Sequence, residues 1–313
     1  MVQELSRRAA VAGGAALTAG LLSTAAAAQP TPPEVDLADD APLGEMGKFD
    51  TNFFGPPSTR AAKSGFVFPG DAESASAYGI DISHHTEAVP WSEIKSARIN
   101  YVYMKASQGA RNRDASLETH WAAATAAGVT CGAYHFLSAG VPGRDQGAYF
   151  LKRIGDVGGL RRGVHLQPVV DLEWDFLGKD FRRTQLKTIG GTPIYKDYWS
   201  DYTSEQIARE VNDCLDVLRQ GLAPLDVRPI IYTNRSWWET RLHPSVRFAG
   251  CTIWTSDYRK ASYANGVPRS VAGHNYHLWQ FTERGRITAG GRSYGPFDCN
   301  KLVTGSLADL LIA

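Results

Sequence analysis

The chain has 313 residues, and its 33 Lys and Arg nearly balance 32 Asp and Glu, so its formal net charge is +1. Hydrophobic residues make up 43% of it and include 8 Trp, enough to bury the core of one large domain. Without a basic excess, the composition argues against nucleic acid and against an anionic membrane surface as partners.

The N-terminus has the composition of an export signal. Arg7 and Arg8 precede an apolar stretch rich in Ala and Gly at 9–22, which is followed by an Ala-x-Ala-like site at 25–28. This order is typical of a cleaved signal of the twin-arginine or Sec type. The stretch is too short for a convincing membrane span, so an uncleaved anchor is the weaker alternative. We predict a signal peptide at 1–28 and a periplasmic or extracellular mature protein.

Residues 29–75 are rich in Pro, Ala, Asp and Gly and lack periodicity, which predicts an arm or linker. From residue 76 onward, short apolar runs alternate with amphipathic or turn-rich stretches. We therefore place a single folded domain at 76–313.

Within this domain, short apolar runs predict strands at 78–82, 101–105, 130–136, 167–173, 229–233, 252–255 and 277–281, and a last one ending near residue 298. Helical patterns fall at 91–97, 117–127, 146–154 and 204–220. Strands and helices in alternation imply a parallel sheet, and eight strands match a closed barrel. The last three connections show no clear helix. We expect an α/β fold, a modified (β/α)8 barrel whose second half is irregular and poor in helices.

The four cysteines, Cys131, Cys214, Cys251 and Cys299, are widely spaced and form no Cys-x-x-Cys pair, which argues against a structural zinc site. In an exported chain they could form disulfides, but Cys131 and Cys251 lie in apolar runs where a buried free thiol is equally natural. Both possibilities stay open.

The most informative segment is Val169-Val170-Asp171-Leu172-Glu173, an apolar run that ends in two carboxylates. Residues two apart in a strand share a face, so Asp171 and Glu173 point the same way with Cα atoms about 6.6 Å apart. Such a pair can divide acid and base work, as glycoside hydrolysis requires.

Polar residues also follow the other predicted strands, at the barrel end where such enzymes carry their chemistry. They are Asp81, Ser83, Lys105, Ser107, His135, Tyr232, Asn234, Asp257, Gln280, Asp298 and Asn300. Because buried charges are costly unless they are paired, so many acids at strand ends indicate an acidic, sugar-sized cleft.

A long stretch at 174–203 follows the acidic pair and contains Trp174, Phe176, Phe181, Tyr195, Tyr198 and Trp199. We interpret it as a cleft wall with aromatic platforms for sugar rings. The alternative is that it caps the barrel and that its aromatic residues belong to the core.

Seven short motifs, in order along the chain, carry a family resemblance. They are Gly79-Ile80-Asp81-Ile82-Ser83, Tyr103-Met104-Lys105-Ala106-Ser107, Gly132-Ala133-Tyr134-His135-Phe136, Pro168-Val169-Val170-Asp171-Leu172-Glu173, Pro229-Ile230-Ile231-Tyr232-Thr233, Leu278-Trp279-Gln280-Phe281 and Phe297-Asp298-Cys299-Asn300. Together they resemble glycoside hydrolase family 25, the lysozymes that cleave peptidoglycan between N-acetylmuramic acid and N-acetylglucosamine.

The resemblance implies a site with four acids. Glu173 matches the general acid, and Asp171 matches the partner that orients the 2-acetamido group of the sugar or attacks the sugar directly. Asp81 and Asp298 match the remaining acids. The resemblance also implies substrate contacts from Tyr134, Tyr232, Lys105, Trp279 and Gln280, a monomer acting on glycan strands, and no metal or cofactor.

Two features depart from the family pattern. Gln108 stands where the family commonly has Glu, and the stretch after Glu173 is longer than usual. The mechanism nevertheless follows from the pair, since the charge of Asp171 and partial burial would raise the pKa of Glu173 and let it act as an acid. Two acids on one strand end lie on the same side of the sugar, which favours retention over inversion.

Two other hypotheses stay open. A metal-dependent barrel hydrolase would use His84, His85, His135 and Asp298, although adjacent histidines point apart in a strand. A carbohydrate-binding protein that has lost catalysis would explain Gln108, but not the retention of four acids. For His135 we favour a hydrogen-bonded barrel residue over a base, and for Trp237, Trp238 and Trp254 we favour packing over sugar binding.

Overall fold

The structure is a computed structural model that describes residues 35–36, 77–189, 191–258, 268–274 and 276–313. The predicted signal at 1–28 and most of the predicted arm at 29–75 lie outside these residues. From the arm the structure describes only strand β1 (Val35–Asp36), which pairs in parallel with β4 (Asn112–Arg113).

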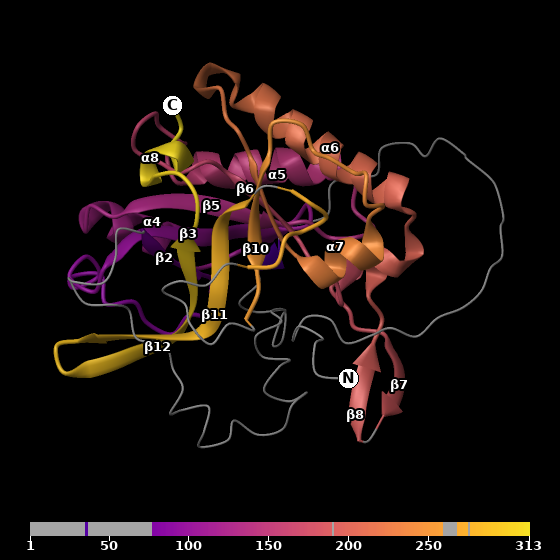
Figure 1. Cartoon of the computed structure of the whole chain (residues 1–313), viewed down its shortest axis with the longest axis horizontal. Helices are drawn as coiled ribbons and strands as arrows, with labels where there is room; N and C mark the ends of the chain where they lie inside the picture. The colour runs from indigo at the N-terminus through magenta and orange to yellow at the C-terminus, as the bar shows by residue number, and fades with distance from the viewer. Residues whose placement is uncertain (1–34, 37–76, 190, 259–267, 275) are drawn as a thin grey trace.

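Eight strands close into a barrel at the centre of the molecule (Figure 1). In order around the barrel they are β2 (Tyr78–Ile82), β3 (Ile99–Gln108), β5 (Thr130–Phe136), β6 (Val169–Leu172), β9 (Ile230–Asn234), β10 (Thr252–Ser256), β11 (Tyr276–Ala289) and β12 (Arg292–Leu302), which pairs with β2. Strand β12 is antiparallel to both neighbours, and the other neighbouring pairs are parallel. The predicted barrel is thereby confirmed.

Alternation along the strands separates the side chains into two cores. The side chains of one set pack against one another inside the barrel; this set includes Tyr101, Tyr103, Val169, Tyr232 and Trp254. The residues between them belong to the core that the helices cover. Because the period of a strand is two, the site residues Asp171, Gln280 and Asn300 fall on the inner face with the first set.

Four helices and a short C-terminal turn surround the sheet: α4 (Leu117–Ala126), α5 (Gly143–Asp156), α6 (Ser204–Gly221), α7 (Arg235–Arg241) and α8 (Leu307–Leu310). Helices α5 and α6 lie side by side in Figure 1. Gly143 permits this approach, because a Cβ there would lie 1.8 Å from the carbonyl oxygen of Glu210. None of the helices among the described residues is long and apolar enough to cross a membrane.

The structure corrects two sequence predictions about helices. Residues 91–98 form turns instead of the predicted helix at 91–97, because Arg98 takes a left-handed conformation (φ 66°) that ends the run after a few residues. Helix α7, in contrast, occupies a connection where we expected none. The side chain of Asn234 accepts a bond from the Trp237 nitrogen (2.8 Å) and caps this helix, which also buries Trp237 and Trp238.

The second half is irregular as expected, because β11 and β12 form a long antiparallel hairpin. Gly290 and Gly291 form its turn with φ of 56° and 74°, which favours glycine at both positions. A second hairpin consists of β7 (Gln185–Ile189) and β8 (Thr192–Tyr195). In Figure 1 both hairpins project from the lower part of the molecule, β11–β12 on the left and β7–β8 on the right.

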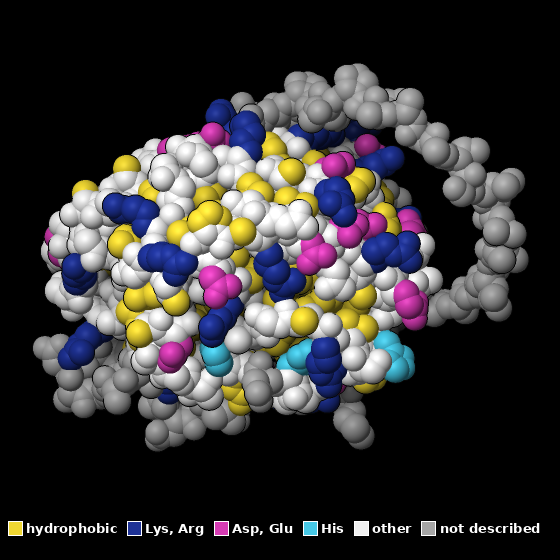
Figure 2. All heavy atoms as spheres, turned by 90° about the horizontal axis from the view of Figure 1, so that it is seen from above, with side chains coloured by type: hydrophobic (Ala, Val, Ile, Leu, Met, Phe, Trp, Pro, Cys, Tyr) yellow, Lys and Arg dark blue, Asp and Glu magenta, His cyan; other side chains and the backbone are white. Residues whose placement is uncertain are grey.

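The helix-covered face has an even distribution of charge. In Figure 2, Lys and Arg side chains alternate there with Asp and Glu. Ion pairs such as Arg144–Asp213 (3.8 Å) and Lys152–Asp156 (3.6 Å) contribute to this pattern. This face therefore presents no area of one sign.

Candidate active site

The four predicted acids come from three strands of the barrel. Asp81 lies near the end of β2, Asp171 lies in β6, and Glu173 follows β6 directly. Asp298 lies in β12, where its Cα pairs with that of Asp81 across the sheet. Asp171 pairs in the same way with Tyr232, whose hydroxyl leads through Gln280 to Asp81. Strand pairing and these two hydrogen bonds thus link Asp171 to Asp81 through β9 and β11.

Asp81 is held by two side-chain amides. Its Oδ2 accepts a hydrogen bond from Nδ2 of Asn300 (2.7 Å) and another from Nε2 of Gln280 (2.9 Å). Both amides are almost fully buried, at 0% and 1% exposure. Two buried N–H donors from neighbouring strands therefore converge on one oxygen of Asp81.

Hydrogen-bond donors to the oxygens of Gln280 and Asn300 fix the orientation of the two amide groups. Oε1 of Gln280 accepts bonds from the hydroxyls of Tyr232 (2.7 Å) and Tyr258, and Oδ1 of Asn300 accepts from the indole of Trp254 (2.8 Å). Because each amide oxygen already has its donor, each NH₂ group must face Asp81. Residues of β9, β10, β11 and β12 therefore contribute to the position of the Asp81 carboxylate.

Asp171 and Glu173 are both 5% exposed. Asp171 lies between Phe136 of β5 and Tyr232 of β9, and its backbone carbonyl accepts a bond from the nitrogen of Leu137 (3.0 Å). Because residues two apart in a strand share a face, the two buried side chains leave the end of β6 on the same side.

Two buried aspartates anchor the chain that leaves Glu173. Asp175 accepts bonds from the backbone nitrogens of Ala139, Leu177 and Gly178 at 2.8 to 3.0 Å, and burial raises its pKa although these bonds oppose the shift. Asp197 accepts from the nitrogen of Asp175 (3.0 Å) and pairs with Arg241 (2.7 Å). Burial raises the pKa of Asp197 to about 6, with Arg241 opposing.

The stretch at 174–203 differs from the predicted wall of aromatic platforms. Trp174 and Trp199 are buried in the core, and Phe176 and Tyr198 pack against it. The guanidinium groups of Arg111 and Arg183 lie over Phe181 and Tyr195, respectively. The alternative prediction, that aromatic residues of this stretch belong to the core, is therefore correct for Trp174 and Trp199.

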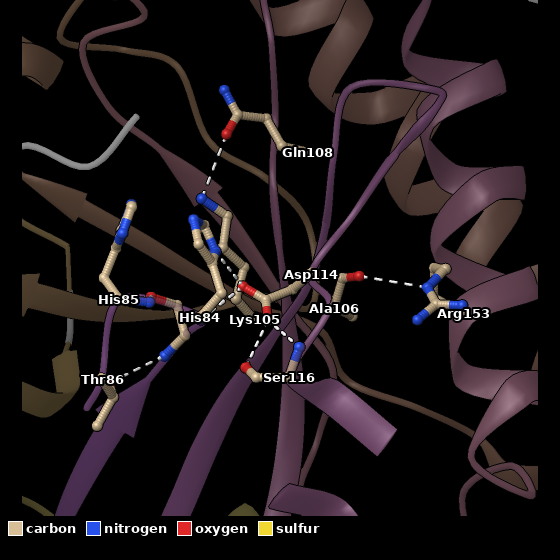
Figure 3. Close-up of polar contacts among 10 residues, drawn as sticks. His84, His85, Thr86, Lys105, Ala106, Gln108, Asp114, Ser116 and Arg153 are labelled. Carbon is tan, nitrogen blue, oxygen red and sulfur yellow. Dashed lines mark hydrogen bonds and ion pairs between the residues drawn. The ribbon is translucent and has the colours of Figure 1, made fainter. Parts of the chain in front are cut away.

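Lys105 is buried beside the residue that departs from the family pattern. Its Nζ donates to Oε1 of Gln108 (3.2 Å) and lies 5.2 Å from the centre of the Phe136 ring. The close-up in Figure 3 shows the Gln108 amide facing this ammonium group. Gln108 is 1% exposed, so a neutral amide provides the lysine with a buried acceptor.

The loop after β2 is fixed by a buried carboxylate, also shown in Figure 3. Asp114 accepts from the ring (2.7 Å) and backbone (2.9 Å) of His84 through one oxygen, and from the backbone and hydroxyl of Ser116 through the other. Burial by itself would raise the pKa of Asp114, but His84 and Ser116 outweigh it and the pKa is lowered. This pairing positions the segment that directly follows Asp81.

His135 has the structural role that we favoured. Its ring is fully buried, stacks on Phe150 and bonds Ser107 (2.9 Å) and Gln146 (3.3 Å). Burial lowers the pKa of His135 to about 3, so the ring is neutral near pH 7. Among the described residues, no group of three His, Cys, Asp or Glu side chains is arranged to hold a metal ion.

The remaining residues of the predicted site differ in where they lie. Tyr134 and Tyr232 belong to the inner core. Trp279 belongs to the outer core and donates its indole N–H to the backbone carbonyl of Asp257 (2.9 Å). All four cysteines are free thiols. Our sequence reasoning missed the role of Asn300, although its i, i+2 spacing from Asp298 places both on one face of β12.

Together, the fold and these residues define a class of protein: a β/α-barrel enzyme with acids at the carboxyl ends of its strands, suited to glycosidic bond hydrolysis. The family model described as "Glycosyl hydrolases family 25" matches residues 80–289. The chain belongs to this family and is a glycoside hydrolase, as the seven motifs predicted.

Individual relatives agree with this assignment. The chain is 29% identical over 253 residues to Lysozyme M1 of Streptomyces globisporus, covering 77% of this chain and 72% of that protein. It is similar to the crystal structure of the bacterial lysozyme from Streptomyces coelicolor, with 26% identity, a TM-score of 0.58, and 76% and 96% of the two chains covered. A family GH25 lysozyme from Aspergillus fumigatus shares the fold at 22% identity, with a TM-score of 0.58 and 76% and 100% covered.

Proposed function

We propose that this glycoside hydrolase is a lysozyme that cleaves the β-1,4 bond between N-acetylmuramic acid and N-acetylglucosamine in peptidoglycan, with retention of configuration. One observation carries the proposal: Asp171 and Glu173 extend, both buried, from the end of one strand in a barrel whose opposite side fixes Asp81. The similarity to Lysozyme M1 and to the Streptomyces coelicolor lysozyme supports the substrate.

Glu173 is proposed as the general acid. It donates its proton to the glycosidic oxygen as the bond to C1 breaks, and the leaving sugar departs as an alcohol. The burial of Glu173 supports this role, because a buried carboxyl group keeps its proton more readily than an exposed one. Water then attacks C1 and gives its proton to Glu173, which restores the starting state.

Asp171 is proposed to orient the 2-acetamido group of the substrate. Its carboxylate accepts a hydrogen bond from the amide N–H, while the acetamide oxygen attacks C1 from the face opposite the leaving oxygen. The bond from C1 to the leaving oxygen breaks as this cyclic intermediate forms, and water later attacks C1 from the face that the leaving oxygen vacated. Water opens this intermediate, so the product retains its configuration. Since Asp171 and Glu173 share one face of a strand, both can act from the same side of the sugar.

Asp81 and Asp298 are proposed to stabilise the positive charge that develops on the sugar ring. A carboxylate contributes most when it is already in place before the reaction. The bonds from Asn300 and Gln280 supply this fixed position for Asp81. A tightly bound thiazoline analogue of the cyclic intermediate would support assistance by the acetamide. A covalent sugar ester on Asp171, trapped by a fluorinated substrate, would instead show direct attack.

The test uses purified peptidoglycan and mass spectrometry of the released muropeptides. The native chain should release fragments that end in reducing N-acetylmuramic acid, and Glu173→Gln should lower the rate by about 10²–10⁴-fold, the usual contribution of a general acid. Exposed Glu87→Gln is the matched control and should retain the native rate. A reducing N-acetylglucosamine end would identify a different bond. Binding without reducing ends would indicate a carbohydrate-binding protein instead.

We further propose that residues 1–28 direct export and that 76–313 form the catalytic domain. The twin arginine supports the first proposal, and replacing Arg7 and Arg8 by lysine should retain the precursor in the cytoplasm if the signal is of the twin-arginine type. Unchanged export of that variant would indicate the Sec route, and no export of the native chain would reject a signal.

A further inference from the structure

The β7–β8 hairpin exposes apolar side chains that a free surface strand rarely carries. All five residues of β7 are exposed, and the two strands form a sheet separate from the barrel. Leu186 and Ile189 are 56% and 57% exposed, and Val164 is the remaining large apolar residue of comparable exposure among the described residues. Exposed apolar side chains that gather on a projecting element mark interaction surfaces.

The base of the hairpin is firmly held. The hydroxyl of Tyr198 donates to the carbonyl of Arg182 (2.9 Å) and bonds the hydroxyl of Thr184 (2.8 Å). The nitrogen of Lys196 donates to the carbonyl of Thr184 (2.8 Å), and the guanidinium of Arg183 lies over Tyr195. A two-stranded hairpin alone is marginally stable in water, so these contacts keep the arm in one orientation relative to the chain that precedes it.

The hairpin and its approach carry excess positive charge. Lys179, Arg182 and Lys187 are exposed, and within the described part of the chain none of the three has an ion pair, while Asp180 is the one exposed acid between residues 177 and 189. The helix-covered face differs, because there acids and bases alternate (Figure 2). Lys187 and Ile189 also share a face of β7, so a cation and an apolar group are presented together.

The hairpin lies in the connection that leaves β6, the strand that contains Asp171 and leads into Glu173, and it projects away from the barrel (Figure 1). It begins twelve residues after Glu173 in the sequence, on the connection that Asp175 and Asp197 anchor. A polymer bound across the acids extends well beyond the sugars that react. Its side groups therefore come within reach of an arm at this position.

We propose that the β7–β8 hairpin binds the peptides that peptidoglycan strands carry, an inference that rests on the proposed function. Peptide carboxylates pair with Lys187 and Arg182, and alanine methyl groups and aliphatic stems pack against Leu186 and Ile189. Charge complementarity selects this occupant, since the free cations match a carboxylate-rich peptide. A second copy of the chain fits poorly, because two such hairpins would repel each other.

The experiment measures binding with the Glu173→Gln chain, so that the glycan is not degraded. Sedimentation compares insoluble peptidoglycan that carries its peptides with the same glycan stripped of them by an amidase. We expect the intact polymer to bind about tenfold more tightly, a difference that several exposed ion pairs can supply. Leu186→Ser combined with Lys187→Glu and Ile189→Ser should abolish the preference. The control, Val164→Ser with Lys95→Glu, changes the same residue types at the amino ends of strands and should preserve it.

Turnover gives a second readout in the otherwise native chain. The hairpin variant should raise KM on intact peptidoglycan without lowering kcat, and it should cleave a short peptide-free glycan at the native rate. Equal affinity of the native hairpin for intact and stripped glycan overturns the proposal. If the native chain shows no preference for peptide-bearing glycan but binds phosphatidylglycerol vesicles, and the hairpin variant loses that binding, the hairpin contacts a lipid surface instead. Peptide-dependent binding by a chain that releases no reducing ends rejects the proposed function and leaves the hairpin proposal standing.

Discussion

Replacing Asn300 by leucine tests whether the amide network positions Asp81. The change keeps the approximate shape of the side chain but removes the 2.7 Å bond to Asp81 and the acceptor of the Trp254 indole. A bond to a charged group contributes about 1.5–3 kcal/mol, and a buried donor without an acceptor costs about 1–3 kcal/mol. Because leucine recovers part of this through apolar contacts, we expect the free energy of unfolding to fall by about 3 kcal/mol.

The same substitution should slow the reaction. The substitution removes the Asn300 donor from Asp81, and a misplacement of about 1 Å in a reacting group can lower the rate by roughly 10²-fold. We expect a loss of this size in kcat/KM on peptidoglycan, measured under conditions where urea denaturation shows the variant to be folded. Exposed Asn212→Leu on α6 is the control for the substitution itself. If Asn300→Leu unfolds at the native urea concentration and keeps the native kcat/KM, the network does not position Asp81.

Three further predictions concern buried groups. Gln108→Leu removes one acceptor of Lys105 and should lower the free energy of unfolding by about 1–3 kcal/mol. Gln108→Glu supplies a charged acceptor instead and should be tolerated; equal urea midpoints for both variants would contradict this. The pKa of His135 is lowered to about 3 by burial, so the unfolded chain binds the extra proton first and stability is lost as pH falls from about 6.5 toward 3. The free energy of unfolding of the native chain should therefore fall relative to that of His135→Gln by at most about 1.4 kcal/mol per pH unit, and parallel curves would refute it. Because all four cysteines are free, a reductant should leave Tm unchanged, and a Tm that drops on reduction would indicate a disulfide. In the folded protein Cys251 alone, which is partly exposed, should react with a thiol reagent, and slowly, because burial raises its pKa to about 11.

The sequence predicts where the proposed acids lie because strands impose a period of two. Asp171 and Glu173 are two residues apart at the end of an apolar run. Asp81 and Asp298 each also stand between apolar residues in a short run. The carboxyl ends of parallel strands meet at one end of a barrel, which predicts that Asp81, Asp171 and Glu173 share that end. Asp298 lies in antiparallel β12, and its pairing with Asp81 came from the tertiary structure. The roles of Gln280 and Asn300 were not accessible in this way, because an amide at a strand end can face a substrate or another side chain equally well.

Local patterns misled where few contacts support an element. The pattern at 91–97 favours a helix, but a run this short depends on its surroundings, and Arg98 ends it. Helix α7 is equally short and has no clear periodicity, yet the burial of Trp237 and Trp238 stabilises it. The aromatic residues at 174–203 were misjudged for a similar reason, because composition does not distinguish an aromatic residue that stacks on a sugar from one that packs in the core.

The sequence by itself predicted the barrel and the family, since these depend on periodicity and on motifs that are local in the chain. Only the tertiary structure decided what holds Asp81, because Gln280 and Asn300 are 199 and 219 residues away along the chain. It also decided that the cysteines are free, that Trp174 and Trp199 belong to the core, and that β7 faces solvent. Each of these depends on contacts between distant segments, which form only when the barrel closes.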